Sequence, residues 1–279
     1  MRRPGMLWLA LPATAVLLFT YVAPMFGLAR MSFNRTLPGG AMQPDWTLAT
    51  YAEMAADSFN LELTLNSIQL SFTATTFALL LAYPVSLFLF RTESRFRSLL
   101  AIIAIGPLLV NGVVRVFGWI AVLGDRGLVN SALLALGLVS EPVRLIYNWT
   151  GVTIGLTESL LPYMVLALLA GFGRLDREVE AAAMSLGARP WRVFVRVTLP
   201  LSLPAIVLGW LICFILAMSA FVTPKLLGGG RVFVLATQVF EEAVDTVNWP
   251  LAAALSVYML VLLLLFLGAY GALTRRVER

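Results

Sequence analysis

The sequence predicts an all-α integral membrane protein with about six transmembrane helices. Hydrophobic residues make up 60% of the chain and charged residues 13%, whereas soluble domains hold about 25% charged residues. Six apolar runs approach the ~20 residues that a helix needs to cross about 30 Å of hydrocarbon. Arginines gather in alternate connections between these runs. No tandem repeat or low-complexity linker divides the chain, so residues 1–279 are expected to form one transmembrane domain.

The apolar runs define the expected spans, with edges defined to about four residues. They are, in chain order, Met6–Leu28, Leu65–Phe90, Leu99–Leu123, Val152–Ala170, Ala205–Phe221 and Leu251–Leu273. The first follows Arg2 and Arg3, as in a signal peptide, but it is too long for an ordinary signal core and has no clean small-residue cleavage site. We therefore expect a retained first span. The third run is interrupted by Asn111 and Arg115.

The distribution of basic residues predicts the orientation, because cytoplasmic connections carry an excess of Lys and Arg. One set of connections holds Arg2, Arg3, Arg91, Arg95, Arg97, Arg174, Arg177, Arg189, Arg192, Arg196, Arg275, Arg276 and Arg279. The opposite set is richer in acids, namely Asp45, Glu53, Asp57, Glu62, Asp125, Glu141, Glu241, Glu242 and Asp245. Both termini, and the segment between the fourth and fifth spans, are therefore expected in the cytoplasm.

The outer connections are expected to contain two short helices. Leu128–Leu138 has helical periodicity and ends near Gly137 and Pro142. Val232–Val244 follows a turn made by three glycines, Gly228–Gly230. These helices either shield the outer mouth of the protein or offer a docking surface to a delivery protein.

The ionisable residues exclude several chemistries. The chain has no histidine and a single cysteine, Cys213, which excludes disulfides within the chain, Cys/His zinc sites and histidine acid–base catalysis. The single lysine, Lys225, follows Pro224, so the chain has no G-x-x-x-x-G-K-[ST] phosphate-binding loop. We therefore expect no enzyme activity, metal or cofactor in this chain. If ATP drives the protein, another polypeptide binds the ATP.

The polar segment between the fourth and fifth spans is expected to begin with a short helix. Asp176 can cap this helix, and Glu178 and Glu180 lie in its first turns, where acids complement the helix dipole. The strong helix formers Ala181–Ala183 follow. Their small side chains would let another surface approach the helix backbone closely.

A sharp turn and a second short helix are expected next. Gly187 supplies the left-handed residue that commonly ends a helix, and Pro190 suits the first turn of the next one. This second helix is expected over Trp191–Val197, ending before Pro200, where the chain re-enters the membrane. The helix pair is suited to a groove in a partner protein, or it lies at the membrane interface with its arginines on lipid headgroups.

The polar segment also carries a recognisable motif. Glu180-Ala181-Ala182, then Gly187 after four intervening residues, then Leu199-Pro200, resemble the EAA loop of ABC-importer permeases. The stretches LPYMVLALLAGFGRLDREVEAAAMSLGA, FVTPKLLGGGR and NWPLAAAL are similar to the first permease subunit of spermidine/putrescine-type importers. The resemblance extends over nearly the whole chain. It implies a type I importer fold whose EAA loop covers about residues 171–203.

The resemblance implies the permease subunit of an ATP-driven importer in the bacterial inner membrane. Such a subunit forms half of the translocation path for a small solute, here a polyamine by resemblance. A dimer of ATPase subunits would bind ATP and Mg, and a second, non-identical permease and a periplasmic or extracellular solute-binding protein would complete the assembly. By resemblance, Glu180 engages the ATPase, Gly187 makes the turn, and Ala181 and Ala182 are small contact positions; Arg189 belongs to the same expected coupling set.

Two ionisable residues inside expected spans are candidates for the translocation path, because charges are costly within a bilayer. On straight helices, Arg115 would lie about 24 Å from Leu99 and Glu158 about 9 Å from Val152. Both would then lie in the outer third of the bilayer, where they can pair.

Asn111, Trp119 and Tyr163 are expected to extend this polar stripe. Asn111 and Trp119 are each four residues from Arg115, which places them on its helix face. Either the stripe lines the path, or the two charges only join two helices. A cationic polyamine suits Glu158 and nearby aromatic rings, whereas an arginine-lined mouth suits an anion. Another small organic solute, amino-acid-like or anionic, is therefore the alternative to a polyamine.

Two other classes of protein are open alternatives. A membrane enzyme would need carboxylates or histidines clustered at one membrane face, and the acids of the inner face lie instead at a helix start. A channel or stand-alone secondary transporter would carry carboxylates near the midplane, and it would commonly show an internal repeat.

Overall fold

The computed structural model describes residues 5–37, 42–173, 175 and 177–277, which group into two compact units. One unit lies within residues 1–63 and 235–279, and the other is Thr64–Val234. The single-domain assignment stays a prediction. Of the residues singled out above, Arg2, Arg3, Arg174, Asp176 and Arg279 lie outside the described residues.

The first unit is built on two membrane-length helices, α1 (Gly5–Met31) and α13 (Trp249–Val277), which pack against each other. Its shorter elements are β1 (Arg35–Thr36), β2 (Met42–Gln43), α2 (Ala49–Ala56), α12 (Leu235–Phe240) and the π-helix η3 (Glu241–Asp245). The two strands pair antiparallel, with Thr36 opposite Met42. The Thr36 hydroxyl donates a hydrogen bond to Asn248 Oδ1 at 2.6 Å, which ties β1 to the start of α13.

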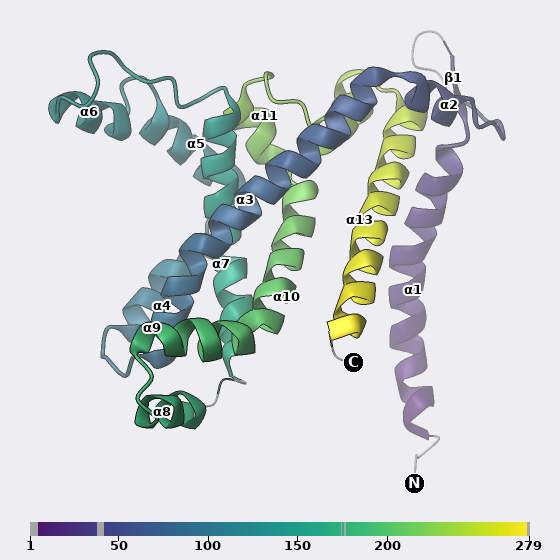
Figure 1. Cartoon of the computed structure of the whole chain (residues 1–279). Helices are drawn as coiled ribbons and strands as arrows, with labels where there is room; N and C mark the ends of the chain where they lie inside the picture. Colours follow the sequence, from purple (N-terminus) through teal and green to yellow (C-terminus); the bar gives the residue numbers. More distant parts are fainter. Residues whose placement is uncertain (1–4, 38–41, 174, 176, 278–279) are drawn as a thin grey trace. The chain divides into compact units, whose positions relative to one another are not determined.

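The second unit contains most of α3 (Ser58–Arg91), together with α7 (Trp149–Phe172) and α10 (Leu199–Met218) (Figure 1). Its shorter elements are α4 (Arg97–Ile105), the 3₁₀-helix η1 (Gly106–Leu109), α5 (Gly112–Leu123), α6 (Leu128–Ala135), α8 (Arg177–Ser185), α9 (Pro190–Val193), the π-helix η2 (Phe194–Thr198) and α11 (Val222–Gly228). Buried apolar side chains of α3, α5, α7 and α10 form its core. Together these helices supply the scaffold of the candidate site.

Five of the six expected spans are confirmed as helices long and apolar enough to cross a membrane within the described residues. They are α1, α3, α7, the continuous segment Pro190–Met218 and α13. The two short helices expected in the outer connections are also present as helices, α6 and α12 with η3; their side of the membrane stays a prediction. The all-α membrane fold follows from the apolar runs themselves, because each run can satisfy its backbone hydrogen bonds in lipid only as a helix or a closed barrel.

The third span is not the straight helix expected over Leu99–Leu123. It consists of Arg97–Leu109, which is α4 with η1, and Gly112–Ala135, which contains α5 and α6, and the two parts are bent by 108°. Pro107 lies in η1 and lacks the N–H of a helical hydrogen bond. The distance of about 24 Å that placed Arg115 along an unbroken helix is therefore wrong.

Asn111 is the N-cap residue of α5, directly before Gly112. Its side-chain oxygen accepts hydrogen bonds from the backbone N–H groups of Val113 at 2.9 Å and Val114 at 3.5 Å. These bonds satisfy donors at the helix start, as an N-cap residue does. The carbonyl of Asn111 accepts from the N–H of Arg115 at 3.1 Å, so the two residues are one helical turn apart, and a role for Asn111 on the translocation path stays a prediction.

The second helix of the polar segment does not stop before Pro200. It continues through α9, η2 and α10 as one span, Pro190–Met218. Within η2, the N–H of Leu199 donates to the carbonyl of Phe194, five residues earlier. This wider turn accommodates the proline that follows, which has no N–H to donate. The expected separate helix over Trp191–Val197 is therefore wrong.

Close packing of α7 on α10 depends on Gly171, because a Cβ added there would overlap the Cβ of Ala205. Small residues let membrane helices approach closely. We expect Gly171→Val to force the helices apart and to destabilise the protein by about 1–3 kcal/mol. The measurement is the thermal unfolding temperature in detergent. Gly118→Val is the control, because Gly118 has no atom within 4 Å of its added Cβ. Equal unfolding temperatures for the two variants would refute this packing role.

Candidate functional site

The polar segment folds into the predicted helix and sharp turn. Helix α8 ends at Ser185, and Gly187, two residues later, has a φ of +84°. The N–H of Gly187 donates to Met184 O at 2.9 Å, and the N–H of Ala188 donates to Ala183 O at 3.2 Å. These two bonds are the Schellman motif, which requires a left-handed residue at this position. Pro190 then occupies the first position of α9, as expected.

One side of this turn is exposed and partly apolar. Four residues of the expected coupling set are exposed, namely Ala181, Ala182, Gly187 and Arg189. Close to them in sequence, the side chains of Leu186 and Trp191 are 89% and 72% exposed. Clusters of exposed apolar side chains mark surfaces that bind another protein or a membrane.

Glu180, the fifth residue of the coupling set, is bound within the chain. Its side chain is 17% exposed, and its Oε1 atom accepts hydrogen bonds from Arg91 Nη2 and from the hydroxyl of Thr198, both at 2.6 Å. Arg91 is the last residue of α3, and Thr198 is the last residue of η2. The EAA glutamate therefore joins α8 to two other elements of the same unit.

Arg115 on α5 and Glu158 on α7 form an ion pair, with 3.2 Å between Arg115 Nε and Glu158 Oε2. Arg115 also donates from Nη1 to Pro107 O at 3.1 Å and from Nη2 to the hydroxyl of Ser159 at 3.0 Å. The indole N–H of Trp119 donates to the same Oε2 atom at 3.2 Å. Arg115 thus reaches a carbonyl beside the helix break. The contacts that Arg115 and Trp119 make with Glu158 both use its Oε2 atom.

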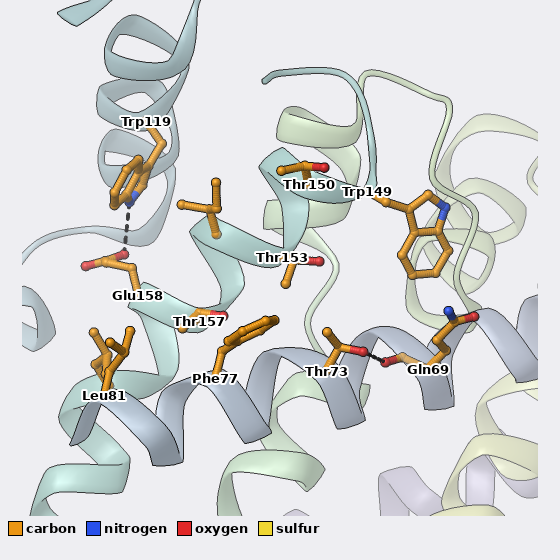
Figure 2. Close-up of a pocket in the computed structure, with 12 residues that line it drawn as sticks. Gln69, Thr73, Phe77, Leu81, Trp119, Trp149, Thr150, Thr153, Thr157 and Glu158 are labelled. Atoms are coloured by element: carbon orange, nitrogen blue, oxygen red, sulfur yellow. Dashed lines mark hydrogen bonds between the residues drawn. The ribbon is translucent and has the colours of Figure 1, made fainter. Parts of the chain in front are cut away.

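A cavity of about 660 Å³ lies beside Glu158. Its lining comes from α3, α5 and α7, namely Gln69, Thr73, Phe77, Leu81, Trp119, Trp149, Thr150, Thr153, Ile154, Thr157, Glu158 and Leu161. Figure 2 shows Glu158 and Trp119 at one end of this group and Trp149 with Gln69 at the other. Aromatic rings, hydroxyls and one carboxylate therefore face a shared space.

A second cavity of about 320 Å³ adjoins Arg115. Its polar lining includes Ser159, Tyr163, Ser219 and Thr223. Of the two residues in the ion pair, Glu158 lines the first cavity and Arg115 lines the second. Likewise, Trp119 lines the first cavity and Tyr163 lines the second.

The hydroxyl residues of α7 were not singled out from the sequence. Thr150, Thr153 and Thr157 line the first cavity and are spaced three and four residues apart on one helix face. This spacing within an apolar run could have revealed them. Thr73 of α3 lines the same cavity, although its hydroxyl bonds to the carbonyl of Gln69 in its own helix.

Residues 70–279 match the protein family described as "Binding-protein-dependent transport system inner membrane component". Since the match covers most of the chain, the chain belongs to this family. It is therefore a multi-pass inner-membrane permease subunit of an ABC importer, as the EAA loop predicted.

The chain is similar to curated permeases with several named solutes. It is 34% identical over 217 residues to the spermidine/putrescine transport system permease protein PotB of Haemophilus influenzae, covering 76% of each chain. To PotB of Escherichia coli it is 31% identical, covering 84% of this chain and 85% of that one. To the molybdenum transport system permease protein ModB of Mycobacterium bovis it is 30% identical, covering 96% of this chain and 94% of that one.

Solved importers share the fold. A chain of a bacterial alginate ABC transporter, in complex with its alginate pentasaccharide-bound periplasmic protein, has a TM-score of 0.82 at 18% identity, covering 100% of this chain and 96% of that one. A chain of the inward-facing methionine transporter MetNI has a TM-score of 0.59 at 16% identity, covering 78% and 96%. At these identities the likeness shows the fold, and it confirms the importer-permease architecture.

Proposed function

We propose that this permease imports a polyamine-like cation and that the first cavity lies on its path. The observation that carries the proposal is Glu158, whose carboxylate faces a cavity walled by Trp119, Trp149 and Phe77. A carboxylate attracts an ammonium group, and aromatic faces attract cations within about 6 Å. The apolar part of the wall suits the methylene chain of such a solute. The names of the PotB relatives support the same class.

The proposed assembly contains two ATPase subunits, a second and different permease, and a periplasmic solute-binding protein. The EAA loop and both termini lie in the cytoplasm, where the exposed turn at Gly187 docks on an ATPase subunit. Closure of the ATPase dimer then moves α8. Because α9, η2 and α10 are one continuous helical segment, displacement of this turn reaches α10 directly. The alginate transporter bound to its periplasmic protein supports the outer partner.

Uptake by reconstituted vesicles tests this function. The chain is co-expressed with the ATPase, second permease and binding protein encoded beside it, and the complex is purified and reconstituted. We expect the four proteins to co-purify and labelled spermidine or putrescine to enter only with ATP. Purification without an ATPase partner, together with uptake that persists without ATP, would instead indicate a stand-alone transporter.

An anionic solute is the second candidate. Arg115 lines the second cavity with Ser159 and Tyr163, and the ModB relative is named for molybdenum transport. However, Arg115 already contacts a carboxylate, a carbonyl and a hydroxyl. A parallel measurement with molybdate separates the two candidates, because molybdate uptake without spermidine uptake would replace the cation with an anion.

Glu158→Gln is expected to raise the KM for spermidine at least about tenfold, equivalent to about 1.4 kcal/mol. The substitution keeps an acceptor for Trp119 and removes the charge that attracts the solute. The measurement is initial uptake against spermidine concentration in vesicles. Glu141→Gln, in an exposed loop, is the control. If the KM and the maximal uptake rate are unchanged, Glu158 only joins α5 to α7.

A further inference from the structure

The carboxylate of Glu180 belongs to a closed network of three side chains. Arg91 Nη2 donates to Glu180 Oε1 at 2.6 Å and to Thr198 Oγ1 at 3.2 Å. The hydroxyl of Thr198 in turn donates to Glu180 Oε1 at 2.6 Å. Each member therefore contacts the other two. Hydrogen bonds to charged groups are about twice as strong as neutral ones, so this network can hold its elements together.

The three side chains come from elements that are distant in sequence. Arg91 ends α3, Glu180 lies in the first turn of α8, and Thr198 ends η2, where the π-helix leads into α10. Other contacts of α8 are made with α9 and η2. The network therefore adds a connection from α8 to α3 and reinforces its connection to the start of α10.

The burial of Thr198 indicates that the hydrogen bond between Thr198 and Glu180 acts within the permease. Thr198 has no solvent-exposed surface, so an ATPase subunit docked on the chain cannot reach its hydroxyl. The Glu180 oxygen that it contacts is the same atom that Arg91 binds. A role for Glu180 through this atom is thus a role within the permease.

We propose that Glu180 is a positioning residue, which holds α8 against α3 and α10 by binding Arg91 and Thr198. The proposal rests on the docking of an ATPase subunit at the turn after α8. With the network intact, displacement of α8 moves the ends of α3 and α10 together. With the network broken, α8 moves separately, and ATP hydrolysis no longer follows delivery of solute.

Thr198 provides the first test. Thr198→Val keeps the shape of the side chain and removes the hydroxyl, whereas Thr198→Ser keeps the hydroxyl. In the purified complex, we expect Thr198→Val to lower spermidine-stimulated ATP hydrolysis at least fivefold without lowering basal hydrolysis. Thr198→Ser should stay within twofold of the parent protein. If Thr198→Ser lowers stimulated hydrolysis more than Thr198→Val does, Thr198 acts through packing and the proposal is overturned.

A charge exchange provides the second test. Arg91→Glu and Glu180→Arg are each expected to lower stimulated hydrolysis at least tenfold, and the double variant should recover to within threefold of the parent. Arg95→Glu makes the same charge change nearby, where the recorded contact of Arg95 is with the ring of Phe96. If the double variant is as impaired as Glu180→Arg alone, the carboxylate acts on the ATPase surface and the proposal fails.

Hydrogen exchange gives a readout that needs no solute. We expect the amides of α8 to exchange at least about tenfold faster in Thr198→Val than in the parent complex, while Arg95→Glu leaves them unchanged. Unchanged exchange in Thr198→Val would overturn the proposal. Failure of the parent chain to assemble with an ATPase would instead refute the proposed function, so the two failures are distinguishable.

Discussion

Gly187→Val is expected to lower ATP-dependent uptake more than tenfold while the membrane helices remain folded. Gly187 has a φ of +84° in the Schellman motif that ends α8. A side chain in the left-handed region costs about 1–2 kcal/mol, and a β-branched one suits it least. Space is not the obstacle, because no atom lies within 4 Å of an added Cβ. The turn can relieve this strain only by leaving the left-handed region, which would displace α8 from the proposed docking position on an ATPase subunit.

Gly137 offers a matched control for that substitution. It follows α6 with a φ of +67°, and the same pair of bonds runs from Gly137 N to Leu134 O and from Leu138 N to Leu133 O. Its added Cβ also meets open space. We expect Gly137→Val to assemble with the ATPase as the parent does, whereas Gly187→Val should lose ATPase subunits during purification. Equal subunit ratios and equal uptake for the two variants would contradict a coupling role for Gly187.

Arg115→Met is expected to destabilise the permease by about 2–3 kcal/mol. The variant leaves Glu158 without its counter-ion and removes the donors to Pro107 O and Ser159. Breaking a fully buried pair costs about 3–5 kcal/mol. We expect less here because both side chains keep about a fifth of their surface exposed, at 20% and 19%. The measurement is thermal unfolding of the purified complex in detergent.

The double variant Arg115→Met/Glu158→Gln separates the two roles that the sequence left open. If the pair only joins α5 and α7, removing both charges should restore stability and transport together. We expect it to restore most of the stability and to leave spermidine uptake impaired, because the carboxylate proposed to attract the cation is gone. Recovery of both quantities would assign the pair to helix packing alone.

Local rules of chain geometry account for the parts of the site that the sequence predicted. The turn after α8 depends on Gly187 and Pro190, whose conformational preferences act within a few residues. The break in the third span carried equally local signals, Pro107 and the capping residue Asn111. Counting apolar residues did not reveal these two signals, because a broken span and a straight span can have the same composition.

Contacts between distant residues account for what the sequence could not predict. Arg91 and Glu180 are separated by 89 positions, and neither residue type indicates its partner. The first cavity depends on which faces of α3, α5 and α7 meet, so Trp149 and Phe77 could not be assigned to it from spacing along one helix. In contrast, the pairing of Arg115 with Glu158 was anticipated as possible because charges within a membrane span need a partner.

The 108° bend between Arg97–Leu109 and Gly112–Ala135 has a mechanical consequence. Bending a continuous helix such as α7 would break backbone hydrogen bonds that lipid cannot replace. At Val110 and Asn111 the helical ladder is already interrupted, and the Asn111 side chain satisfies the first donors of α5. The backbone hydrogen bonds of α5 are therefore independent of those of η1, so a change in the angle between them would break none of these bonds. The contact of Arg115 with Pro107 O joins the two sides of the break, and the ion pair with Glu158 holds α5 to α7.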